Sequence, residues 1–147
     1  MPYTVAIKYV SPKPASAEHC AVRLTSRLAA TKVKSGESVR LDVEVRNVSG
    51  KDTAMATAIL GLPGGLTVRT EELKKLVEQD RIAFFETRGR EVILYWRALA
   101  ADATEKLTLN PVADIPGSFS GPASRAYLYY SDDVKWWVDP LKVEITR

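Results

Sequence analysis

The 147-residue sequence contains a single cysteine and a single histidine, and these scarcities exclude several classes of protein. One cysteine, Cys20, permits no disulfide within the chain. A zinc site needs three or four converging Cys, His or acidic ligands, so no metal site is expected. His19 directly precedes Cys20, and neighbours along a strand point to opposite faces, so the two do not make a nucleophile and its base. We expect Cys20 to be buried as a small apolar residue.

The sequence also lacks a long apolar run and a strong excess of charge of one sign. No stretch approaches the ~18 consecutive apolar residues of a membrane-spanning helix, so no membrane insertion is expected. The net charge is only +3, and Lys and Arg are spread among Asp and Glu. Nucleic-acid binding usually requires a clustered basic stripe, so a nucleic-acid partner is not expected. No signal peptide is recognisable, and we expect residues 1–147 to be one domain excised from a larger protein.

Two near-motifs lack the residues that their chemistry requires. Residues 117–121, Gly-Ser-Phe-Ser-Gly, have Phe119 where a nucleophile elbow has serine. Residues 62–66, Leu-Pro-Gly-Gly-Leu, lack the Gly-Lys-Ser/Thr ending of a phosphate-binding loop, and their glycines are read as a turn. With no convergent nucleophile, base or metal ligands, we expect neither enzymatic activity nor a cofactor, and a small hydrolase is disfavoured.

Alternation of apolar and polar residues over short segments is abundant. It is clearest at 38–48, where Val39, Leu41, Val43 and Val45 alternate with charged residues. Related patterns predict strands at 3–10, 20–27, 53–62, 82–86, 91–97, 104–112, 123–130 and 135–146, a hairpin turn at 87–90 and a loop at 114–122. Turn signals spaced ~8–12 residues apart indicate a mainly-β fold, an antiparallel two-sheet β-sandwich.

One segment has helical periodicity instead. Leu73, Leu76 and Val77 recur at i, i+3 and i+4, which predicts a short helix over about 70–79 with these three residues buried. Thr70 is the expected N-cap, and acidic residues fill the first turn, where the helix dipole favours them. The helix lies on a connection between two strands.

The exposed side of this helix is basic. Lys74 and Lys75 lie on it, with Arg69 before the helix and Arg81 after it. One interpretation is an ordinary solvated helix face. The other is a docking site for an acidic protein partner, because lysine ammonium groups complement clustered carboxylates.

Five aromatic residues gather near the C-terminus: Tyr127, Tyr129, Tyr130, Trp136 and Trp137. Strand alternation separates Tyr127 and Tyr129 from Tyr130, and it separates the two tryptophans, so some of these rings must reach a surface or an interface. Core packing is the alternative for each ring. A further alternative is an adhesion or carbohydrate-binding sandwich that stacks sugars on exposed Trp or Tyr.

Three segments, taken in order, carry a resemblance to a known family. They are residues 33–47, which enter a strand on a Gly-Glu turn; residues 61–66, Gly-Leu-Pro-Gly-Gly-Leu; and residues 126–130, Ala-Tyr-Leu-Tyr-Tyr. Over about residues 3–145 the chain resembles the C-terminal receptor-binding domain of the alpha-2-macroglobulin family, which is related to domains of complement components. That domain is a β-sandwich with a helix on a strand connection.

The resemblance implies a non-catalytic protein-interaction domain at the C-terminus of a protease-trapping (endopeptidase inhibitor) or thioester protein. Such a parent would be secreted and so extracellular, periplasmic or cell-surface, and the domain alone would be monomeric. Its partners would be a cell-surface receptor or other domains of the parent.

The resemblance also implies site residues. In the family, two lysines four positions apart on the helix bind the receptor; here the second matches Lys74 and the first falls on Thr70. The receptor-binding residues would be Lys74, Lys75 and Arg69. The family's tyrosine strand lies against the thioester domain and keeps water from the thioester. That interface would comprise Tyr127, Tyr129 and Tyr130, with Leu128 in place of the family's aspartate.

Overall fold

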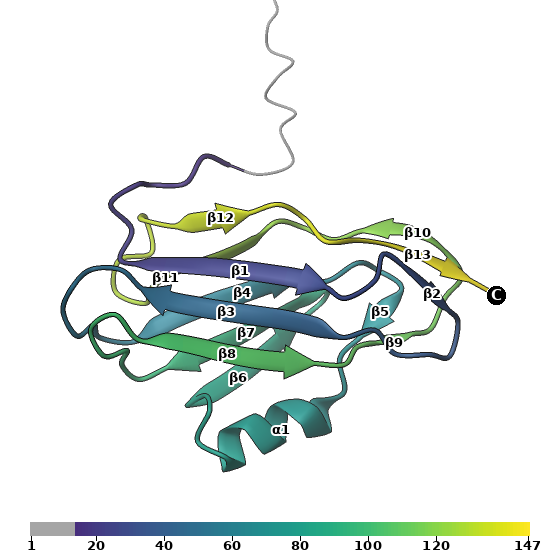
Figure 1. The fold of residues 1–147 in the computed structure, drawn as a ribbon, viewed down its shortest axis with the longest axis horizontal. Coiled ribbons are helices and arrows are strands. Elements are labelled where there is room, and N and C mark those ends of the chain that lie inside the picture. The colour runs from purple at the N-terminus through teal and green to yellow at the C-terminus, as the bar shows by residue number, and fades with distance from the viewer. Residues whose placement is uncertain (1–13) are drawn as a thin grey trace, which may run out of the picture.

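Strands dominate residues 14–147, the part of the chain that the computed structural model describes (Figure 1). In chain order they are β1 (Val22–Leu28), β2 (Lys32–Lys34), β3 (Leu41–Asn47), β4 (Ala56–Gly61), β5 (Leu66–Thr67), β6 (Phe84–Arg88), β7 (Glu91–Trp96), β8 (Thr104–Leu109), β9 (Val112–Ala113), β10 (Gly117–Ser120), β11 (Ser124–Leu128), β12 (Trp136–Val138) and β13 (Lys142–Thr146). The helix α1 (Thr70–Glu78) lies between β5 and β6. The strand expected at 3–10 falls outside the described residues.

The two main layers are a three-stranded and a five-stranded sheet. The first has the order β1-β3-β8 and the second the order β12-β11-β4-β7-β6, with antiparallel neighbours throughout. Figure 1 shows the smaller sheet in front of the larger one. The sandwich expected from the sequence is therefore confirmed.

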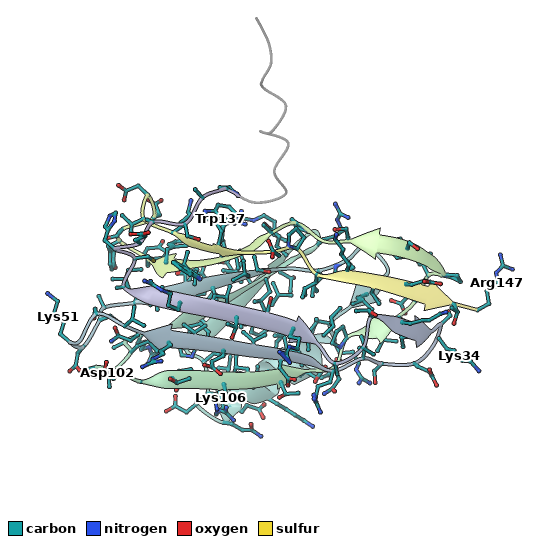
Figure 2. All side chains as sticks on the ribbon, turned by 45° about the horizontal axis from the view of Figure 1, so that its top comes forward. Lys34, Lys51, Asp102, Lys106, Trp137 and Arg147 are labelled. Carbon is teal, nitrogen blue, oxygen red and sulfur yellow. The ribbon has the colours of Figure 1, made fainter. Side chains whose placement is uncertain are left out.

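The alternation at 38–48 is confirmed at the level of single residues. Val39, Leu41, Val43 and Val45 are all buried and belong to the core between the sheets. Cys20 is buried there too, as expected. Side chains fill the space between the layers (Figure 2). Burying this apolar surface is the main favourable contribution to folding.

The ends of the sandwich depart from the expected pattern. The segment expected as a loop contains β10, which pairs with β13 and sets Phe119 opposite Val143. The strand expected at 135–146 is two strands, β12 and β13, separated by residues 139–141, which include Pro140; proline cannot donate to a ladder. Strand β13 also pairs in parallel with β2, so the fold is not antiparallel throughout.

Helix α1 confirms the predicted element and corrects two of its details. Leu73 and Leu76 are buried in the core, but Val77 is 36% exposed, because it lies at the margin of the apolar stripe. Thr70 is the first helical residue rather than the cap; Arg69 holds the N-cap position and makes no side-chain capping bond. In Figure 1, α1 lies along one long side of the sandwich, next to β6 and β8.

Among residues 14–147, no helix has both the length and the apolar character to cross a bilayer.

Candidate functional site

Four aromatic rings form a continuous, largely exposed row, which we call the aromatic patch: Phe84, Tyr95, Tyr129 and Tyr130. The ring centroids of Tyr129 and Tyr130 are 5.1 Å apart at an interplanar angle of 86°. Those of Tyr95 and Tyr129 are 6.1 Å apart at 63°, and those of Phe84 and Tyr95 are 5.8 Å apart at 34°. The first two contacts are edge-to-face, a preferred geometry for aromatic pairs.

Strand register brings these rings together from three elements. Phe84 on β6 is directly opposite Tyr95 on β7, and Tyr95 is opposite Thr57 on the central strand β4. Tyr129 follows β11, and its backbone N–H donates to the Met55 carbonyl at 2.8 Å, just before β4 begins. The row therefore crosses the outer face of the five-stranded sheet near one end of its strands.

The patch lines an open groove with a volume of about 510 Å³. The other lining residues are Met55, Ala83, Glu86 and Arg97. Tyr130 is 79% exposed, Phe84 57% and Tyr129 47%, whereas Tyr95 between them is half-buried. Large aromatic side chains that remain this exposed are typical contact anchors.

Tyr95 connects the aromatic patch to the one acidic side chain of the groove. Its hydroxyl donates to a Glu86 carboxylate oxygen at 2.6 Å. Burial and, after it, the Glu86 carboxylate, which would repel a phenolate beside it, together raise the pKa of Tyr95 from 10.0 to about 12. Tyr95 is therefore a neutral donor near pH 7, and it fixes the orientation of Glu86.

An apolar layer lies beneath the charged residues of the same outer face. Ile59 and Ile93 are opposite each other and are 5% and 2% exposed, yet they do not belong to the core between the sheets. Arg125, opposite Ile59, forms an ion pair with Glu91 at 2.9 Å. Thr57 lies between Tyr127 and Tyr95, and its buried hydroxyl has no hydrogen-bond partner among residues 14–147. The outer face is thus unusually apolar for the solvent side of a sheet.

The two tryptophans do not share a surface. Trp136 packs against the core, and the Arg23 guanidinium lies 4.0 Å from its ring centroid. Trp137 is opposite Arg125 on the outer side, with that guanidinium 5.2 Å from its ring centroid. Figure 2 places Trp137 at the opposite side of the molecule from Lys106. Two half-buried rings on opposite faces of β12 cannot form one sugar-stacking platform.

The remaining tyrosine, Tyr127, is set apart from the aromatic patch. It is half-buried on β11, and the Lys135 ammonium lies 5.4 Å from its ring centroid. Burial raises the pKa of Tyr127. Of the three tyrosines singled out from the sequence, the structure joins Tyr129 and Tyr130 to the groove and leaves Tyr127 at its margin.

The basic helix residues form a separate surface. Arg69, Lys74 and Lys75 are all exposed, and their side chains make no hydrogen bond or ion pair with another described residue. Arg81 differs, because its guanidinium donates to the Lys106 carbonyl and its own carbonyl accepts from the Trp96 indole. Arg69, Lys74 and Lys75 do not line the groove, and they are not part of the ring contacts of the aromatic patch.

The fold of this chain matches solved structures, although the sequence comparisons find no match. No family model matches the sequence, and no curated protein matches it significantly. Among solved structures, a mutant of Salmonella alpha-2-macroglobulin superposes with a TM-score of 0.70 over 91% of this chain at 17% identity. Trypsin-activated alpha-2-macroglobulin from Escherichia coli gives 0.71 over 92% at 14% identity. The native Escherichia coli protein from domain MG7 to the C-terminus gives 0.66 over 91% at 16% identity.

This chain has the fold of the C-terminal region of bacterial alpha-2-macroglobulin. It spans 10% of the Salmonella chain, 11% of the trypsin-activated chain and 25% of the segment that begins at MG7. The fold implied by the sequence resemblance is therefore confirmed.

Half of the aromatic patch was missed by sequence reasoning. Phe84 and Tyr95 belong to the hairpin formed by β6 and β7, and neither was a candidate site residue. The signal was available in the sequence, since a two-residue turn at Gly89 and Arg90 fixes Arg88 opposite Glu91 and hence Phe84 opposite Tyr95. Only the contact with Tyr129 required the tertiary structure.

The structure also places the residues that were considered for metal binding and for nucleophilic chemistry. No group of three or more His, Cys, Asp or Glu within residues 14–147 could hold a metal ion. The Cys20 thiol is buried, and burial raises its pKa, which keeps it from the reactive thiolate form. His19 is exposed, so the two side chains do not form a catalytic pair.

Proposed function

We propose that this chain is a non-catalytic protein-interaction domain from the C-terminus of an alpha-macroglobulin-like protein, and that its aromatic patch packs against another domain of that parent. The observation that carries the proposal is the exposed pair Tyr129 and Tyr130, supported by Tyr95 and Phe84, on this particular fold. As part of such a parent, the domain would act in the periplasm, outside the cell or on its surface, and would be monomeric by itself.

The geometry of the tyrosine pair supports this role. Tyr130 is supported by Tyr129, which is in turn supported by Tyr95, so little side-chain entropy is lost when a partner covers the rings. If the parent contains a thioester, rings in this position would exclude water from it before activation. Tyr127, already covered by Lys135, would lie at the rim of such an interface.

The direct test measures binding between this chain and the remainder of its parent, prepared as separate polypeptides. Replacing Tyr129 and Tyr130 with Ala should weaken binding by at least about 2 kcal/mol, or roughly thirtyfold in Kd, as for anchor residues elsewhere. The matched control replaces Lys74 and Lys75 with Glu and should leave binding unchanged. Unaltered affinity after loss of both tyrosines would refute the packing role. In a thioester-bearing parent, the tyrosine variant should also hydrolyse its thioester faster.

A second candidate function rests on the exposed basic residues of α1 and of its N-cap. Arg69, Lys74 and Lys75 are exposed and unpaired among the described residues, so they are available to the carboxylates of an acidic receptor. Against it stands Thr70, which replaces the first lysine of the family's receptor motif. Binding of an acidic receptor fragment that Lys74→Glu abolishes, and that the tyrosine substitutions do not affect, would establish this function instead.

A further inference from the structure

Strand β6 is an open edge of the five-stranded sheet. Within residues 14–147 its only strand partner is β7. Four of its five residues are exposed, including Thr87, whose side chain points to the inner side of the sheet by alternation. Helix α1 is nearby, but it leaves these residues accessible. An open edge offers backbone groups to a further strand.

The turn that joins β6 to β7 determines which backbone groups are free. Arg88 and Glu91 flank the two-residue turn, so they are a hydrogen-bonded pair, and pairs of this type alternate along the ladder. The N–H and C=O groups of Phe85 and Thr87 therefore point away from β7. Neither residue makes a backbone hydrogen bond elsewhere in the described chain. The strand contains no proline that would prevent pairing.

The outer side of β6 presents three different side chains in succession: apolar Phe84, acidic Glu86 and basic Arg88. Phe84 and Glu86 line the groove, and Glu86 is held by the Tyr95 hydroxyl. Arg88 makes no hydrogen bond or ion pair with another described residue. If an antiparallel strand is added, the residues opposite these three are in the non-hydrogen-bonded positions, where facing side chains are closest.

We propose that β6 is a docking edge for an extended strand of a protein partner, which pairs antiparallel with β6 and places one apolar side chain in the groove beside Phe84. Charge complementarity specifies the sequence of that strand. Read from its N-terminus, it carries an acidic residue opposite Arg88, a basic residue opposite Glu86 and an apolar residue opposite Phe84, at alternate positions. This is recognition by strand addition, in which backbone bonds supply affinity and alternate side chains supply specificity. It does not depend on the packing of Tyr129 and Tyr130 against a parent domain.

The test titrates the isotopically labelled chain with two synthetic peptides and follows its backbone amides by NMR. The matched peptide has the core Glu-Thr-Lys-Thr-Val, and the swapped peptide has the core Lys-Thr-Glu-Thr-Val. The matched peptide should bind about tenfold more tightly, because opposite charges across strands attract and like charges repel. It should also slow the hydrogen exchange of the Phe85 and Thr87 amides. A double variant, Glu86→Lys with Arg88→Glu, should reverse the preference.

Two further variants separate edge pairing from a general surface effect. Thr87→Pro removes an outward N–H that β7 does not use, so binding should be lost while the amide signals of β1 and β3 stay unchanged. Lys106→Glu, a charge change on the edge strand of the other sheet, should leave binding as it was. The proposal is overturned if both peptides bind equally, if the protected amides lie on β8 or β12, or if the matched peptide produces no response on β6 up to about 1 mM.

Discussion

Tyr95 is the residue through which the aromatic patch responds to pH. Its pKa is raised to about 12 by burial and by Glu86, while the unfolded chain titrates near the ordinary value of 10.0. A raised pKa means that the folded state favours the neutral phenol. The resulting stability is complete below about pH 10 and is lost as the pH rises towards 12. We expect the free energy of unfolding to fall across this interval, and Tyr95→Phe to reduce that fall.

Urea unfolding at a series of alkaline pH values would check this, with phenolate absorbance reporting the titration directly. Tyr130→Phe provides the matched control, because that ring is exposed and makes no hydrogen bond to a carboxylate in the described part of the chain. Equal alkaline slopes for the native chain and the Tyr95→Phe variant would contradict the role given to the bond between Tyr95 and Glu86.

Single residues also show where prediction from the sequence succeeds. The burial of Val39, Leu41, Val43 and Val45 follows from alternation alone, because one face of the strand must pack and the other must meet water. The groove could not be obtained this way. Tyr129 contacts Tyr95 only because β11 and β7 pair on either side of β4, and that strand order is a long-range property of the fold.

At the scale of elements, α1 has no side-chain cap, and its apolar anchors are two buried leucines, beside the hydrogen bonds that Glu72 accepts from Asn110. Leu76→Ala should lower the free energy of unfolding by about 2–5 kcal/mol, since it removes buried methyl groups from a packed core. Val77→Ala is the matched control and should cost less than about 1 kcal/mol, because its side chain is 36% exposed. Urea midpoints for both variants measure the difference. Similar losses of unfolding free energy in the two variants would mean that Val77 is packed as closely as Leu76, which would contradict their different burial.

The turn that follows β4 depends on a close approach of two backbones. A Cβ on Gly61 would overlap the carbonyl oxygen of Pro122. Because that oxygen belongs to the backbone, the overlap could be relieved only by shifting β4 or the segment before β11. At Gly64 the nearest atom to a new Cβ is 3.4 Å away, on the flexible Phe119 side chain. We expect Gly61→Ala to destabilise the chain by roughly 1–3 kcal/mol or more and Gly64→Ala to be tolerated. Thermal unfolding would rank the two, and the opposite order would contradict the structure.

Elements were predictable where the pattern was long and uninterrupted. The β3 strand, the helix and the hairpin all appear within a few residues of their expected positions. Strand β10 was missed because Pro116, Gly117, Gly121 and Pro122 give the segment the composition of a loop. Its four residues are nonetheless ordered by pairing with β13, and such long-range pairing overrides local propensity.

At the scale of the whole molecule, the aromatic patch and the basic helix surface make opposite predictions about salt. Contacts of the patch are mainly apolar, so binding through Tyr129 and Tyr130 should be nearly independent of ionic strength. Binding through Lys74 and Lys75 should weaken markedly as salt rises, because exposed charge pairs are screened over a Debye length of about 10 Å at 0.1 M and about 3 Å at 1 M. Isothermal titration of one partner at both salt concentrations distinguishes the two surfaces without any mutation. Thr70 stands where the resemblance implies the first of the two receptor-binding lysines, whereas all four rings of the aromatic patch are present. We therefore expect a neighbouring domain of the proposed parent to bind through the patch, with little dependence on salt. Strong salt dependence would instead assign the partner to the helix.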